Sequence, residues 1–296
     1  MKVYLVDGTY ELFRHFYALP SYINRRGEEV AAVRGVVGSM FSLMQEGATH
    51  IAIATDHVIE SFRNDLWADY KDGSGIDPRL RSQFDLLEDA LQSAGFIVWP
   101  MVQFEADDAL AAGAALSAAD DRVEQVIVCT PDKDLSQCVV GDRVIQLDRR
   151  RRKIFNRQGV IEKFGVAPEF IPDYLALIGD SADGYPGLRG WGPKSTAAAI
   201  RRYGHLEDFP SGSLDLPVKN SGSLCAAFSN QRDMALLFRR LATLVTQDVI
   251  HSTVDELCWR TPPEDFNAMC QRLESPALLE RAQSLSRNRG SKMILS

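Results

Sequence analysis

The sequence has few cysteines and no long apolar run. None of its five cysteines forms a Cys-x-x-Cys pair, which argues against a disulfide framework and against a compact thiolate zinc site. The longest apolar runs are far shorter than the roughly 20 residues of a membrane span. The N-terminal run MKVYLVD reaches an Asp at position 7, so it lacks the apolar region of a signal peptide. We therefore expect a cytoplasmic protein with no membrane partner.

The chain also lacks an excess of positive charge. Its 33 Lys and Arg face 40 Asp and Glu, and the net charge is −7. Taken alone, that balance lowers the odds of a nucleic-acid binder. The composition, 45% hydrophobic and 25% charged over 296 residues, is that of a globular chain of about two domains.

Apolar runs and helical periods alternate in the first half of the chain. Strands are predicted at 2–7, 50–56, 96–101 and 125–132, and helices at 30–47, 78–95 and 107–119. This alternation predicts an α/β fold with a parallel sheet covered on both faces. From about residue 157 only helices are expected, at 157–165, 169–180, 193–204 and 231–245, with a surface loop at 210–224.

Acidic side chains gather where the predicted strands end. Ligands of open parallel sheets bind outside the carboxyl ends of the strands, so these carboxylates are expected to converge on one edge. Each alone has an ordinary explanation, because Asp commonly forms turns or caps helices. The nine candidates are Asp7, Asp56, Glu105, Asp107, Asp108, Asp132, Asp134, Asp180 and Asp183.

Nine carboxylates at one edge would repel each other strongly unless cations lie among them. Oxygen ligands without His or Cys suit magnesium or manganese rather than zinc, and carboxylate-rich two-metal sites are a recurring solution for cleaving phosphodiesters. Without these nine groups the net charge rises from −7 to +2, so the acidic balance does not exclude a polyanionic substrate. The basic run RRRRK at 149–153 is explained equally by a solvated hairpin turn and by a DNA contact.

A second constellation is GLRGWGPKSTAAAI at 187–200. Gly190 and Gly192 precede an Ala-rich helix whose N-terminus could approach a phosphate, with Lys194 or Ser195 adding contacts. A plain interhelical turn is the default explanation of two glycines. The run is not a Walker motif, because GxxxxGK[ST] is absent.

The segment 57–80 is long for a connection in a compact domain. It carries basic residues, among them Arg63, Lys71 and Arg79, close to aromatic residues such as Trp67 and Tyr70. This mixture suits a single strand of nucleic acid, through charge and stacking. A surface loop whose aromatic residues pack on the core is an equally good explanation.

Taken together, these motifs resemble the 5′ nuclease superfamily, above all the 5′–3′ exonuclease domain of bacterial DNA polymerase I and its stand-alone flap-endonuclease relatives. The matching motifs, in order, are LVDGT (5–9), LFRHFYAL (12–19), ATD (54–56), SFR…YK (61–71), EADDALA (105–111), TPDKDLSQ (130–137), GDSADGYPGLRGWGPKSTA (179–197) and RRLATL (239–244).

The resemblance implies a PIN-like parallel-sheet nuclease core at 1–165 with an arch segment at 57–80. It also implies a helical DNA-binding subdomain with a helix–three-turn–helix at 166–285. Residues 286–296 are expected to be a loosely ordered tail. Two departures from the family pattern are Ser74, where YKxxR has Arg, and Gly184-Tyr185, where Asn-Ile is usual.

By the same resemblance, the nine carboxylates bind two Mg²⁺ or Mn²⁺ ions. Asp7, Asp56, Glu105 and Asp108 would hold one ion most directly, and the other ion would lie near Asp132, Asp134, Asp180 and Asp183. Lys71 and Arg63 would neutralise the scissile phosphate, as catalytic residues. Tyr70, Gly190, Gly192, Lys194 and Ser195 would contact DNA, and a K⁺ ion is expected at the helix–three-turn–helix.

The function expected is therefore magnesium-dependent 5′–3′ exonuclease or flap-endonuclease action on DNA with 5′ ends, flaps or nicks. We expect a monomer that works with a polymerase or ligase and associates with the nucleoid when on DNA. A PIN-like ribonuclease shares the carboxylate-edged sheet but typically lacks the arch and the helix–three-turn–helix. A DNA-binding module without catalysis would gain nothing from a repulsive acidic cluster.

Overall fold

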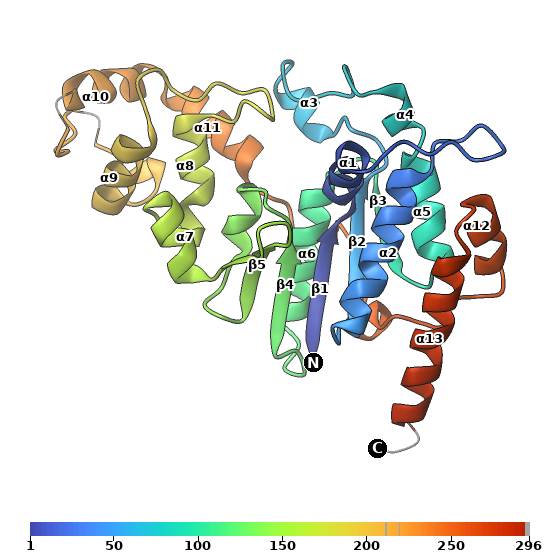
Figure 1. Cartoon of the computed structure of the whole chain (residues 1–296). Coiled ribbons are helices and arrows are strands. Elements are labelled where there is room, and N and C mark those ends of the chain that lie inside the picture. The colour runs from blue at the N-terminus through green and yellow to red at the C-terminus, as the bar shows by residue number, and fades with distance from the viewer. Residues whose placement is uncertain (211, 219, 294–296) are drawn as a thin grey trace.

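The computed structural model describes residues 1–210, 212–218 and 220–293, and its centre is a mainly parallel sheet (Figure 1). In this described part, six strands lie in the order β3-β2-β1-β4-β5-β6. They are β1 (Lys2–Asp7), β2 (His50–Asp56), β3 (Ile97–Met101), β4 (Gln125–Cys129), β5 (Val144–Asp148) and β6 (Lys153–Phe155). All pairings from β3 to β5 are parallel, and β6 is antiparallel to β5. The predicted parallel sheet is confirmed. Strands β5 and β6 were not predicted, although a hairpin turn at 149–153 was one of the two explanations of the basic run.

Helices cover both faces of the sheet because successive strand side chains point to opposite faces. On β1, Val6 packs into one layer and Leu5 into the other. The first layer contains α1 (Gly8–Ala18), α2 (Ala31–Gln45) and α5 (Phe84–Ser93), and the second contains α6 (Ala106–Ala118). The predicted α/β sandwich is therefore the observed one.

The helical part has a core of its own. Its elements are α7 (Arg157–Phe164), α8 (Ile171–Ile178), α9 (Pro193–Tyr203), α10 (Ser221–Asn230) and α11 (Arg232–Ala242). Leu224, Cys225 and Phe228 of α10 are buried in this core. The expected loop at 210–224 was therefore wrong at its C-terminal end, because these apolar residues begin a packed helix.

After α11 the chain returns to the α/β part. Val254 and Leu257 pack on the α6 side of the sheet, while α12 (Phe266–Arg272) and α13 (Pro276–Met293) pack beside α2 and α5. Figure 1 shows α12 and α13 at the opposite end of the sheet from α7–α11. The expectation that 166–285 forms one helical subdomain was therefore wrong for its last part.

Helix α13 extends to Met293, so the expected tail at 286–296 is helical over residues 286–293. Leu278, Ala282 and Leu285 lie three and four residues apart and are buried against the core, so one face of α13 is held by packing. Residues 294–296 lie outside the described part.

The helix predicted at 78–95 is interrupted. It divides into α4 (Pro78–Arg81) and α5, with Ser82 and Gln83 between them. The fully buried Gln83 donates from Nε2 to the carbonyl of Arg79 at 3.1 Å and accepts from the amide of Val33 at 3.4 Å. The side chain thus takes a carbonyl that a continuous helix would pair with a backbone amide.

The basic run at 149–153 lies at the turn of the β5–β6 hairpin. Because β5 is parallel to β4, this turn lies at the carboxyl edge of the sheet. Arg150, Arg151 and Arg152 are exposed, whereas Arg149 is partly buried and its Nη1 lies 3.2 Å from Glu11 Oε1. Among the described helices, none is both long and apolar enough to cross a membrane.

Candidate active site

Three carboxylates follow three neighbouring strands at one edge of the sheet. Asp7 and Asp56 end β1 and β2, and Asp132 follows β4, which is the other neighbour of β1. Burial raises the pKa of Asp7 to about 7, and the charges of Asp56 and Asp132 contribute to that rise. The predicted convergence of these three side chains is therefore present, and they interact as like charges.

Each carboxylate of this group is held by the chain around it. Asp7 accepts from the amide of Tyr10 at 2.8 Å and from Thr130 Oγ1 at 2.9 Å. Asp56 accepts at Oδ1 from the amide of Ala106 at 2.9 Å. Thr130 was missed in the sequence analysis, although its place in the run TPDKDLSQ beside Asp132 was the available signal.

The N-terminus of α6 brings three more carboxylates to the same edge. Glu105 is the residue that caps this helix, and Asp107 and Asp108 lie in its first turn. Burial and then the charge of Asp132 raise the pKa of Asp107 well above its usual range. Asp107 therefore faces the carboxylates of the strand ends.

Asp108 differs from its neighbours because it is fully buried and paired. Its two oxygens accept from Arg63 Nη1 and Nη2 at 2.7 and 2.8 Å, and further bonds come from the amides of Glu105 and Val245. The expectation that Asp108 holds an ion directly is therefore contradicted by the geometry, since its oxygens are already occupied.

Arg63 is 1% exposed, and all five of its N–H donors are used. Besides Asp108, they reach Glu105 Oε1 at 3.1 Å and the carbonyls of Leu241 and Thr243 at 2.8 and 3.0 Å. A guanidinium with five donors in use has none left for a phosphate. The expected phosphate contact of Arg63 is therefore wrong, and the residue instead connects α3 (Phe62–Leu66), α6 and the end of α11.

Lys71 reaches the carboxylate edge. Its Nζ lies 2.7 Å from Glu105 Oε2 and 3.2 Å from Asp183 Oδ1. Burial alone would disfavour the ammonium, but the charges of Glu105 and Asp183 raise the pKa of Lys71 well above its usual value. Lys71 and Arg63 both contact Glu105. Their positive charges lower the pKa of Glu105, although burial alone would raise it.

Tyr70 is not available for stacking on a base. It is 4% exposed, it packs in the helical core, and its hydroxyl lies 3.4 Å from Glu105 Oε2. The expected DNA contact of Tyr70 is therefore contradicted. Burial of its ring instead orients the adjacent Lys71 toward the carboxylates.

A second group of carboxylates lies where η1 (Asp134–Cys138) meets the turn after α8. Asp134, Asp180 and Asp183 each place one oxygen within 4.8 Å of the others. Burial, followed by the charges of Asp132 and Asp183, raises the pKa of Asp134 well above its usual range. Burial also raises the pKa of Asp183, to about 6.

This second group is only partly neutralised by the protein. Lys133 Nζ lies 2.7 Å from Asp180 Oδ2. Asp134 Oδ1 is buried and has no hydrogen-bond partner among the described residues. A buried carboxylate oxygen without a partner costs free energy, and a hard cation would remove that cost. The oxygen-only donor set fits Mg²⁺ or Mn²⁺.

The segment 57–80 packs against the helical part of the protein. The Trp67 ring lies edge-on to Phe238, with ring centroids 5.2 Å apart, and Trp67 Nε1 donates to the carbonyl of Gly184 at 3.1 Å. The amide of Lys71 donates to the carbonyl of Asp183 at 3.0 Å. The aromatic residues thus fix the segment to the carboxylate turn, while Ser74 stays exposed.

The glycine-rich turn leads into the N-terminus of α9. Gly190 adopts φ +88°, which favours glycine, and it is exposed together with Lys194. The Ser195 hydroxyl is 9% exposed and bonds the amide and carbonyl of Gly192 at 3.1 and 3.0 Å. Ser195 therefore caps the helix rather than presenting a free hydroxyl, whereas Gly190, Gly192 and Lys194 remain accessible.

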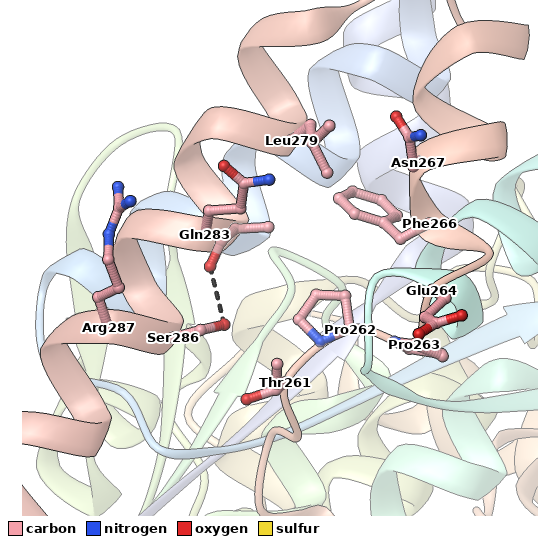
Figure 2. A pocket seen from close by; sticks show the side chains of 11 residues that line it. Thr261, Pro262, Pro263, Glu264, Phe266, Asn267, Leu279, Gln283, Ser286 and Arg287 are labelled. Atoms are coloured by element: carbon pink, nitrogen blue, oxygen red, sulfur yellow. Dashed lines mark hydrogen bonds between the residues drawn. The ribbon is translucent and has the colours of Figure 1, made fainter.

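Two cavities differ in their relation to these carboxylates. One of about 580 Å³ is lined by Trp67, Lys133, Gly184 and Tyr185, so it adjoins the second group. Another of about 520 Å³ lies between α12, α13 and residues 261–264, where Phe266 and Leu279 line it (Figure 2). The residues that line the latter all lie between Thr261 and Arg287 and include no neighbour of the nine carboxylates, so it is separate from the candidate active site.

Comparison with known proteins agrees with this geometry. Residues 2–165 match the family model of the 5′-3′ exonuclease N-terminal resolvase-like domain, and residues 166–265 match the 5′-3′ exonuclease C-terminal SAM fold. A 5′-3′ exonuclease of Aquifex aeolicus is 29% identical over 99% of both chains. DNA polymerase I of Pseudomonas aeruginosa is 34% identical over 86% of this chain but only 28% of that protein.

Solved structures share the fold. The T5 D15 protein co-crystallised with metal ions has a TM-score of 0.66 at 19% identity, covering 97% of this chain and 99% of that one. The catalytic core of Rad2 in complex with a DNA substrate has a TM-score of 0.63 at 15% identity, covering 96% and 92%. With a family model covering more than half of its length, a carboxylate-edged sheet and a helical module in the matching order, this chain belongs to the 5′-3′ exonuclease family.

Proposed function

We propose that the protein hydrolyses phosphodiesters of DNA near 5′ ends, flaps and nicks, using two Mg²⁺ or Mn²⁺ ions. The observation that carries this proposal is the buried carboxylate group of Asp134, Asp180 and Asp183, with one oxygen of Asp134 unpartnered. The carboxylates of the strand ends adjoin it, because Asp132 raises the pKa of both Asp7 and Asp134. Structures of the T5 exonuclease with metal ions and with zinc support metal dependence.

The residues divide into two ligand groups in this proposal. Asp7, Asp56, Glu105 and Asp107 would hold one ion, and Asp132, Asp134, Asp180 and Asp183 would hold the other. Bound ions would lower the pKa of a water and stabilise the negative charge that develops on the phosphate. Asp108 would act indirectly, because its pairing with Arg63 places Glu105 at the edge.

Lys71 would neutralise the negative charge of the scissile phosphate at the carboxylate edge. Its raised pKa keeps the ammonium charged at neutral pH, and a charged donor gains most where water is excluded. In the free protein Lys71 is paired with Glu105 and Asp183, so the substrate phosphate would compete with these carboxylates for the ammonium.

Duplex DNA would lie along the N-terminus of α9. Backbone amides at a helix N-terminus attract phosphate, and the exposed Gly190 and Lys194 and the partly exposed Gly192 allow close approach. The exposed arginines of the β5–β6 turn lie at the same edge as the carboxylates and would add phosphate contacts. A K⁺ ion held by carbonyls of the glycine-rich turn belongs to the same proposal.

We further propose a cytoplasmic monomer that acts together with a polymerase or ligase. The DNA polymerase I relatives carry the matching segment within a longer chain, which supports a polymerase as partner. Incubating the protein with a 5′-labelled flap, a nicked duplex and a matched RNA, each with Mg²⁺ or EDTA, tests the function. Cleavage of RNA alone, or cleavage in EDTA, would contradict it.

We expect Lys71→Ala to lower the single-turnover rate on saturating flap substrate by about 10²-fold or more, since a lost transition-state donor costs about 3–4 kcal/mol. Duplex affinity should change little, because Lys71 faces the carboxylates rather than α9. Quenched-flow kinetics with a 5′-labelled flap would measure the rate. An unchanged rate would show that Lys71 has only a structural role.

We expect Lys194→Ala to weaken binding to duplexes of every sequence and to lower the slope of log affinity against log salt by about one. The single-turnover rate at saturation should be nearly unchanged. Fluorescence anisotropy at several salt concentrations would measure the slope, with the exposed and remote Lys2→Ala as a control. An effect confined to the chemical rate would rule out a phosphate anchor.

A further inference from the structure

Tyr185 is a buried phenol in the turn that carries Asp180 and Asp183. Its backbone pairs with that of Asp180 in both directions, at 2.8 and 3.0 Å. Its side chain is 1% exposed, and its ring stacks on Phe238 with centroids 5.5 Å apart and an interplanar angle of 28°. The ring is therefore held between the carboxylate turn and the helical core.

The turn around Tyr185 has little freedom to move. Gly184 adopts φ +83°, and a Cβ at this position would lie 2.0 Å from the carbonyl oxygen of Asp69. The Gly184 carbonyl also accepts from Trp67 Nε1. Glycine is required here, and the position of the Tyr185 ring is fixed by its neighbours on both sides.

The hydroxyl of Tyr185 is buried and has no hydrogen-bond partner in the described part of the chain. Packing on Phe238 does not explain the hydroxyl, because a Phe would pack in the same way without burying an unpaired polar group. Asp134 Oδ1 is also buried and also lacks a hydrogen-bond partner among the described residues. Asp134 and Asp180 belong to one carboxylate group, and Asp180 pairs through its backbone with Tyr185.

The two atoms lie in the same electrostatic environment. After burial, the charge of Asp134 is the largest cause of the raised pKa of Tyr185, followed by those of Asp180 and Asp183. Neither atom has a direct hydrogen-bond partner in the described part of the chain, so a link between them would pass through water. A cavity lined by both Lys133 and Tyr185 lies beside this turn, and Lys133 Nζ contacts Asp180 Oδ2.

We propose that the Tyr185 hydroxyl is a positioning group for the cation held by Asp134, Asp180 and Asp183, acting through water. The inference rests on the metal-dependent function proposed above. Mg²⁺ keeps several waters when it binds to carboxylates, and hydrogen bonds to the groups around a metal orient its ligands. Tyr185 lies in the turn that carries Asp180 and Asp183, and its backbone pairs with that of Asp180 in both directions.

The test compares Tyr185→Phe with wild type in the absence of DNA. Titration with Mn²⁺, followed by electron paramagnetic resonance, should show one of two ions bound about 10- to 100-fold more weakly by the variant. Tyr203→Phe is the matched control, because it removes a phenol hydroxyl that bonds the amide of Asp215 instead of facing this group. It should bind Mn²⁺ as the wild type does.

Stability measurements separate positioning from a structural role. In EDTA, Tyr185→Phe should be at least as stable as wild type, because an unpaired hydroxyl is lost. The increase in Tm on adding Mn²⁺ should be smaller in the variant, as expected from weaker binding to the native state. A purely structural hydroxyl would lower Tm in EDTA and leave the increase unchanged, which would overturn the inference.

A second measurement uses wild-type protein carrying ¹³C at the phenol carbon of tyrosine. Mg²⁺ should shift the resonance that disappears in Tyr185→Phe, and an unshifted resonance would overturn the inference. If wild type binds Mn²⁺ and Asp134→Asn loses an ion while Tyr185→Phe does not, the inference alone fails. If neither wild type nor Asp134→Asn binds Mn²⁺, the proposed metal-dependent function fails with it.

Discussion

Asp134→Asn should reduce the single-turnover rate of DNA cleavage by about 10³-fold or more, equivalent to about 4 kcal/mol in the activation barrier. Asp134 is 5% exposed and shares its group with Asp180 and Asp183. The amide keeps the size of the side chain but removes the charge that holds a cation. The rate would be measured with a 5′-labelled flap at saturating Mg²⁺.

The same change should stabilise the metal-free protein above pH 5. Because burial and like charges raise the pKa of Asp134, the folded protein pays for ionising this carboxyl, and stability falls as pH rises above the unfolded value of about 3.9. Because Asn does not ionise, Asp134→Asn should lack this decrease in the free energy of unfolding. Urea unfolding in EDTA should show a difference at pH 8 that vanishes near pH 3, where the carboxyl is protonated in both states.

The matched control is Asp121→Asn, an exposed carboxylate that precedes β4 at the other end of the sheet. It should change neither the cleavage rate nor the dependence of stability on pH. If Asp134→Asn kept the wild-type cleavage rate at saturating Mg²⁺, the assignment of Asp134 as a metal ligand would be wrong.

The largest effect on stability is expected from Arg63→Ala, a loss of about 3–5 kcal/mol in the free energy of unfolding. Arg63 is the fully buried partner of Asp108 and Glu105, and it also bonds the carbonyls of Leu241 and Thr243. Its removal leaves Asp108 as a buried charge without its cation. Urea unfolding at neutral pH would measure the loss.

Arg239→Ala is the comparison for this prediction. Arg239 pairs with Asp173 and Glu207, but its side chain is 26% exposed, so its loss should cost about 1 kcal/mol or less. Arg63→Lys should fall between the two, because an ammonium keeps the charge but has three donors instead of five. A loss below about 1 kcal/mol in Arg63→Ala would mean that Arg63 does not join the two parts of the protein.

Arg63 and Lys71 show that residue type alone does not determine whether a basic side chain can contact substrate. Both are basic residues of the segment 57–80, and the sequence motif gives both the same expected role. In the structure, Arg63 is enclosed by α6 and the end of α11 while Lys71 reaches Glu105 and Asp183. Whether a cation is free to contact substrate depends on segments distant in sequence: Arg63 bonds Asp108 45 residues away and Thr243 180 residues away.

The same distinction separates the carboxylates. Asp7, Asp56 and Asp132 could be placed from sequence because a parallel strand brings its C-terminal residue to a common edge whatever surrounds it. Asp107 and Asp108 are neighbours in the first turn of one helix, and sequence alone could not distinguish them. Helix geometry turns adjacent side chains about 100° apart, so one faces the strand ends and the other faces Arg63.

Local patterns along the chain therefore determined which segments form most of the strands and helices, and which carboxylates lie at their ends. These depend on short-range periodicity and on the parallel sheet, and they were sufficient to indicate the metal-dependent chemistry. The tertiary structure alone decided the packing of residues 249–285 on the nuclease core, the burial of Arg63, Tyr70 and Asp108, and the unpaired hydroxyl of Tyr185. These features arise from contacts between segments distant in sequence, whose free energy depends on complementary shape and charge rather than on any local pattern.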